Sequence, residues 1–152
     1  MILSLLLQAA VPVACPTPAA PLPAAMAGWR APVQATAGRE LAIGRAARVS
    51  LEPVTAVRFA AAPERSGKPG DRGGTYAFRI ASAGTYRVAL DSAAWVDVVG
   101  GGKPVASAAH GHGDRCAGIR KMVDYRLTPG RYVLQLSGAA QPAAVVMVAR
   151  IG

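Results

Sequence analysis

The sequence predicts an all-β protein, a single β-sandwich of about eight short antiparallel strands that follows an N-terminal signal-like segment. Three observations support this prediction. Large apolar side chains alternate with polar ones through most of the second half, and the 17 glycines and 12 prolines recur at short intervals. Beyond the first residues, no window shows a sustained helical period. At 152 residues the chain has the length for one hydrophobic core.

The first residues resemble an export signal. Residues 2–14 are apolar and uncharged, and such a run is too short for a bilayer-spanning helix, which needs about 20 residues. The positive segment that usually opens a signal is missing, because the first charge is Arg30. A buried N-terminal strand is the alternative. We therefore expect residues 1–27 to be a signal-like segment with an Ala/Pro-rich linker, residues 28–152 to form the sandwich, and the protein to be periplasmic or secreted without a transmembrane span.

Cys15 has three alternative fates. A small residue precedes it, as in a lipoprotein signal, which predicts a lipid anchor at Cys15. The A-x-A sequence from Ala25 to Ala27 is instead typical of a cleavage site that would remove this cysteine. In an oxidising compartment, a disulfide between Cys15 and Cys116 is the third alternative.

The strands follow in order from residue 45. Alternation or a continuous apolar run predicts strands over 45–51, 55–59, 75–80, 85–90, 94–99, around 105, 119–127, 132–136 and 144–151. The glycine-rich residues 66–74 are expected to form a flexible surface loop, and 81–84 has the length of a hairpin connection. The apolar run 144–151 predicts a strand that is central or covered on both faces. In the linker, Trp29 either docks on the sandwich or is exposed.

One sequence pattern occurs twice. The segment from Gly84 to Leu90 and the segment from Gly130 to Leu136 both contain a glycine, a tyrosine two positions later and a leucine four positions after that. We expect the glycine to make a turn, while Tyr86 and Tyr132 bury their rings and extend their hydroxyls to a backbone group. The repetition therefore predicts the same structural corner in two places.

The strongest candidate site lies between the predicted strand around residue 105 and the predicted strand 119–127. His110 and His112 would point to one side of an extended segment, and Cys116 follows four residues later, with Asp114 as a fourth ligand. Such a set predicts a Cu, Zn or Fe site. The alternative is a glycine-rich solvated loop that is tethered by a Cys116 disulfide.

Other charged residues give weaker signals. The formal charge of +9 comes mostly from arginines that are spread singly along the chain, which predicts solvated charges and no nucleic-acid partner. An anionic glycan or an anionic membrane surface remains an open partner class, and Arg120 with Lys121 would suit an anion. Asp97 could serve as an acid or base, but no second carboxylate is spaced to work with it, so we expect Asp97 to lie on a solvated face or to pair with an arginine.

The order of elements from Thr75 to Gly152 resembles the bacterial pre-peptidase C-terminal (PPC) β-sandwich, a jelly-roll-like fold. The matching pieces are Phe78, the Ala83–Tyr86 turn, Leu90, the segment 96–98, and the segment 127–136. Such domains are usually accessory modules of secreted enzymes. The resemblance therefore implies an exported, non-catalytic binding or envelope-accessory module, whose ligand it does not identify.

The chain is also similar to short exported bacterial proteins named homogentisate 1,2-dioxygenase. That activity needs an iron site with two histidines and a carboxylate. Here His110 and His112 supply the histidine pair, and Cys116 stands where the carboxylate would follow. The alternative to a binding module is thus a small metalloprotein, in one form a non-haem iron dioxygenase.

Overall fold

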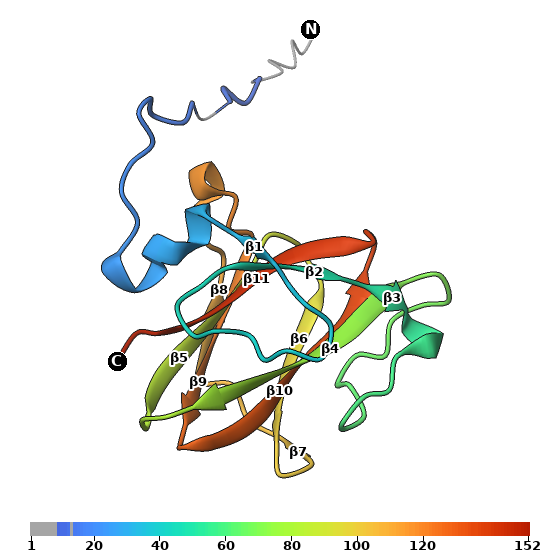
Figure 1. The fold of residues 1–152 in the computed structure, drawn as a ribbon. Coiled ribbons are helices and arrows are strands. Elements are labelled where there is room, and N and C mark those ends of the chain that lie inside the picture. Colours follow the sequence, from blue (N-terminus) through green and yellow to red (C-terminus); the bar gives the residue numbers. More distant parts are fainter. Residues whose placement is uncertain (1–8, 13) are drawn as a thin grey trace, which may run out of the picture.

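The computed structural model describes residues 9–12 and 14–152 and contains two β-sheets packed face to face (Figure 1). Sheet A has the spatial order β1 (Val33–Gln34), β2 (Ala47–Ser50), β11 (Ala143–Arg150), β5 (Gly84–Leu90), β9 (Lys121–Leu127) and β8 (Ala109–Gly111). Sheet B has the order β3 (Glu52–Pro53), β4 (Arg72–Ile80), β10 (Gly130–Ala139), β6 (Trp95–Gly100) and β7 (Lys103–Pro104). The pair β1–β2 is parallel, and the longer strands pair antiparallel. The predicted all-β sandwich is confirmed.

The main core lies between the sheets, where alternate side chains of each strand face inward. From β9 the inward residues include Val123, Tyr125 and Leu127, as the alternation predicted. Phe78 and Leu134 from sheet B are fully buried opposite them. Because few rings are available, valine, leucine and alanine fill most of this space.

Two tyrosine corners join the sheets. The Tyr86 hydroxyl donates to the Ser82 carbonyl oxygen (2.6 Å), and the Tyr132 hydroxyl donates to the Thr128 carbonyl oxygen (2.9 Å). Each bond joins residues four positions apart. Each corner also lies where the chain passes from one sheet to the other, from β4 to β5 and from β9 to β10. The repeated sequence thus marks the same corner twice. It also means that the connection 81–84 crosses between sheets, so the hairpin prediction there is wrong.

A third layer covers the outer face of sheet A. The 3-10 helix η1 (Ala24–Arg30) buries Met26 and Trp29 against outward-facing side chains of β11, and Ile119 joins the same contact. This outer cluster consists of Met26, Trp29, Ala46, Ala89, Ile119, Val145, Met147 and Ala149. Hence β11 is covered on both faces, as predicted, and Trp29 docks on the sandwich. Ile119, however, belongs to this outer cluster instead of sharing the inner face of β9.

The structure differs from the sequence predictions in two further segments. Residues 55–59 are not a strand, because the chain forms the 3-10 helix η2 (Val54–Ala56) and then continues without regular structure. The reason is that β3 ends where Pro53 pairs with Arg72, the first residue of β4, so the following residues have no partner strand. The predicted surface loop 66–74 is shorter than expected, since its last three residues begin β4.

The structure tests only some of the predictions for the N-terminal segment. The apolar segment 2–14 lies mainly outside the described residues, which exclude 1–8 and 13. The domain boundary predicted at residues 27 and 28 falls inside η1, and Met26 on its leader side is buried in the outer cluster. Within the described ranges, no helix is long and apolar enough to cross a membrane.

Candidate functional site

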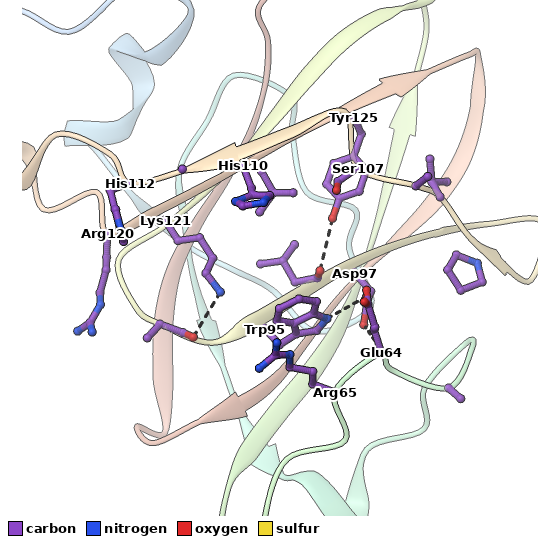
Figure 2. Close-up of a pocket in the computed structure, with 18 residues that line it drawn as sticks. Glu64, Arg65, Trp95, Asp97, Ser107, His110, His112, Arg120, Lys121 and Tyr125 are labelled. Carbon is purple, nitrogen blue, oxygen red and sulfur yellow. Dashed lines mark hydrogen bonds between the residues drawn. The ribbon is translucent and has the colours of Figure 1, made fainter.

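A cleft of about 1050 Å³ opens along one side of the sandwich, between β6 and β7 of sheet B and β8 and β9 of sheet A. Figure 2 shows His110, Lys121 and Tyr125 on the sheet A side of this cleft and Trp95 and Asp97 on the sheet B side. The cleft lies at the edge of the sandwich where β7 and β8 are short, and it continues around the edge of β6 to the outer face of sheet B, where Asp97 and Trp95 lie beside Gln135 and Ser137.

The sheet A wall comes from the inward face of β9. Val123 and Tyr125 are buried, and the Tyr125 hydroxyl donates to the Val96 carbonyl oxygen (3.4 Å) across the cleft floor. Burial, with smaller contributions from the carboxylates of Asp97 and Glu64, raises the pKa of Tyr125 well above its usual value. Its hydroxyl therefore stays protonated at neutral pH and cannot act as a base there.

Lys121 explains the single break in the β9 alternation. It occupies an inward position at the start of the strand, where the cleft replaces the core, and its Nζ donates to the carbonyl oxygen of Ala94 (2.7 Å). Burial lowers the pKa of Lys121, and the nearby guanidinium groups of Arg65 and Arg120 lower it further. Three cations, Arg65, Arg120 and Lys121, thus line the same cleft.

The sheet B wall carries Trp95 and Asp97. The Trp95 indole Nε1 donates to the Asp97 carboxylate (3.2 Å), and the backbone N–H of Glu64 donates to the same carboxylate (3.2 Å). Asp97 is only 8% exposed, so these two donors compensate for its lost hydration. The expectation that Asp97 lies on a solvated face or pairs with an arginine is therefore wrong, because its carboxylate is buried and accepts from an indole and a backbone N–H. Trp95 also contacts two cations, the Arg65 guanidinium at 4.7 Å and the Lys121 ammonium at 5.4 Å from the ring centroid.

A loop over the outer face of sheet B brings Glu64 and Arg65 to the cleft. This covering loop, residues 60–65, is held by two polar side chains of β10 that are each 1% exposed. The Gln135 amide oxygen accepts from the backbone N–H groups of Ala60 (2.6 Å) and Ala61 (3.2 Å), and its amide nitrogen donates to the Ala61 carbonyl (3.0 Å). The Ser137 hydroxyl donates to the Arg65 carbonyl oxygen (2.7 Å).

Sequence analysis missed Gln135, Ser137 and Arg65. In β10 the polar residues Gln135 and Ser137 alternate with the leucines Leu134 and Leu136, and such a pattern indicates that the polar face is solvated. Nothing in the neighbouring sequence shows that a distant loop covers this face. The one hint is that residues 60–65 lack periodicity and precede the glycine-rich segment. This pattern is typical of any long connection, so it does not indicate that the loop covers a sheet.

Replacing Gln135 with leucine should release the covering loop. The change removes three hydrogen bonds and leaves two backbone N–H groups without their acceptor, so we expect the free energy of unfolding to fall by about 1–3 kcal/mol. Urea denaturation measures the loss, and hydrogen exchange should speed up at Ala60 and Ala61. The matched control is Gln141→Leu in an exposed turn, and equal effects of the two changes would contradict this role of Gln135.

The residues predicted as metal ligands are separated by the structure. His110 and His112 both line the cleft from β8 and the residue after it, as their spacing suggested. Asp114 instead caps the 3-10 helix η3 (Arg115–Ala117), where its carboxylate accepts from the backbone N–H of Cys116 (2.8 Å) and Ala117 (3.3 Å). Across residues 9–12 and 14–152, no three His, Cys, Asp or Glu side chains are gathered as a metal site would require.

Cys116 forms a disulfide with Cys15, with the two Cα atoms 5.4 Å apart. Of the three alternatives for Cys15, the bridge is the one present in the structure. It attaches the N-terminal segment beside the point where the Trp29 indole donates to the Ala117 carbonyl oxygen (2.8 Å). While the bridge exists, neither sulfur is available as a thiolate ligand or as a lipid attachment point.

The cleft therefore combines a fixed polar framework with free cationic groups. Tyr125, Asp97 and Lys121 are each engaged with a protein partner, whereas the guanidinium groups of Arg65 and Arg120 make no hydrogen bond or ion pair within the described part of the chain. Comparison of the chain with protein-family models, with curated proteins and with solved structures finds no match.

Proposed function

We propose that this chain is an exported, non-catalytic binding module whose ligand occupies the cleft between β6–β7 and β8–β9. The observation that carries this proposal is the cleft itself. Its volume of about 1050 Å³ is in the range of small-molecule sites, and it is lined by apolar side chains with a few convergent polar groups.

Binding is favoured over catalysis by the state of the polar groups. The Asp97 carboxylate accepts two hydrogen bonds, the Tyr125 hydroxyl donates to a backbone carbonyl, and Lys121 donates to the end of the β5–β6 connection. Side chains fixed in this way shape a site and orient a ligand, and none of these three is free to act as a general base.

Export is supported by the Cys15–Cys116 bridge, because disulfides persist in oxidising compartments such as the periplasm and the extracellular space. The resemblance of residues 75–152 to PPC sandwiches implies the same setting and the same accessory class. A metal-binding function has less support, since the bridge takes up Cys116 and Asp114 caps η3, which leaves the two histidines alone.

Filling the cleft tests this proposal. Val105 lines the cleft and packs partly on the main core, so Val105→Phe should place a ring in the cleft while the strands remain paired. Val33→Phe is the matched control, because Val33 is exposed on β1 at the opposite edge of sheet A. We expect titration calorimetry with a panel of neutral and acidic saccharides, amino acids and phosphate to detect binding that is lost in Val105→Phe and kept in Val33→Phe. Equal binding by both variants would contradict the cleft as the site.

A further inference from the structure

The cations in the cleft lack the carboxylate partners that such groups usually have. In the described part of the chain, the ion pairs are Arg79–Glu40, Arg87–Asp124 and Arg131–Glu40, and they all lie outside the cleft. Arg65 and Lys121 instead both lie against the Trp95 ring, 4.7 Å and 5.4 Å from its centroid, and Arg120 lines the same cleft next to Lys121. Their like charges repel one another, and both guanidinium groups lower the pKa of Lys121. An anion placed among them would relieve this repulsion.

Arg65 is presented in a form suited to such an anion. Its backbone carbonyl is held by Ser137, and its guanidinium lies against the Trp95 ring, 4.7 Å from the centroid. The ring contact holds the guanidinium in the cleft, and none of its N–H donors is hydrogen-bonded to another described residue. A planar guanidinium with free donors pairs bidentately with a carboxylate or a phosphate.

The remaining polar groups indicate what else the ligand carries. Glu64 and Asp97 line the same cleft, and their carboxylates would repel a second negative charge but can accept hydrogen bonds from hydroxyl groups. Ser107 and His110 add further polar contacts on the other side (Figure 2). The set therefore suits a ligand with a single negative charge and several hydroxyl groups.

The size of the cleft favours a ligand larger than a bare ion. A volume of about 1050 Å³ is at the upper end of the range for small-molecule sites, and an inorganic phosphate would leave most of it filled with water. Building on the proposed binding function, we infer that the ligand is a carboxylated saccharide whose carboxylate binds Arg65 and the neighbouring cations, with its hydroxyl groups facing Asp97 and Glu64.

Cellobiouronate, a disaccharide of glucuronate and glucose with one carboxylate, and its methyl ester test this inference, because they differ mainly in the charge of that single carboxyl group. We expect calorimetry to show binding of the acid that is at least about tenfold tighter than binding of the ester. Arg65→Gln should weaken binding of the acid by about tenfold or more, whereas Arg126→Gln, which removes the same charge from the exposed face of β9, should leave it unchanged. Added salt should weaken binding of the acid more than binding of the ester.

Three outcomes would overturn the inference. In the first, the ester binds as tightly as the acid, and Val105→Phe abolishes binding of both ligands. The cleft is then a binding site that does not select an anion, so the proposed binding function holds and the inferred ligand is wrong. Binding of inorganic phosphate as tightly as the saccharide, or binding only to phosphatidylglycerol vesicles, would assign the cations to a phosphate group instead. If none of these probes binds, the carboxylated saccharide is wrong, and the wider panel with the Val105→Phe control then decides the proposed function separately.

Discussion

Removing the Cys15–Cys116 disulfide should lower the free energy of unfolding by about 4–5 kcal/mol. The two cysteines are 101 residues apart, and a bridge that closes a loop of this length restricts the unfolded chain strongly. Part of the loss also arises in the folded state, because the bridge attaches the N-terminal segment beside the Trp29 contact with Ala117. The variant to measure is Cys15→Ser/Cys116→Ser, which avoids a free thiol, by urea denaturation.

Reduction of the unmodified protein provides the control. With a reductant present, the wild-type protein should unfold at the same urea concentration as the double variant, and the double variant itself should not respond to reductant. Intact mass and thiol titration of the purified protein should show both cysteines oxidised and no lipid on Cys15. A double variant whose stability stays within about 1 kcal/mol of wild type would show that the bridge contributes little.

Replacing Trp29 with alanine should cost about 3–5 kcal/mol, the range for deleting a large aromatic side chain from a core. Trp29 is 5% exposed, and its ring lies in the outer cluster between η1 and sheet A, next to Met147. The variant removes this ring and also leaves the Ala117 carbonyl without the indole donor. Thermal and urea unfolding measure the cost.

Trp29→Phe is the matched control, because it keeps most of the buried aromatic surface and removes the hydrogen bond. We expect it to lose roughly 1–2 kcal/mol, clearly less than the alanine variant. Combining Trp29→Ala with Cys15→Ser/Cys116→Ser should cost less than the sum of the separate losses, since both act on the attachment of the same segment. A negligible loss in Trp29→Ala would mean that η1 is not part of the cooperative fold.

The alternation of side chains was sufficient to predict most of the sandwich. It identified the long strands β5, β9 and β10, and the continuous apolar run of β11 correctly indicated a strand with both faces covered. The repeated glycine and tyrosine spacing predicted both corners, because a tyrosine corner depends on residues only four positions apart. These features are local, so a single sequence contains them.

Features that depend on distant partners were not predictable in this way. Nothing near residues 81–84 indicates that β4 and β5 join different sheets, and nothing near Gln135 indicates that residues 60–65 cover it. The cleft also depends on which strands end each sheet. Sequence analysis therefore placed His110, His112 and Lys121 in the right region, but could not join them to Trp95 or Arg65.

The central claim, that the cleft binds the ligand, is tested most directly by the two tryptophan indole N–H resonances. The chain has two tryptophans, Trp95 in the cleft and Trp29 beneath η1 on the outer face of sheet A. In protein labelled with ¹⁵N-tryptophan, addition of cellobiouronate should shift the Trp95 resonance progressively to saturation and leave the Trp29 resonance in place. A Trp95 resonance that stays fixed while calorimetry reports saturable binding would contradict the account.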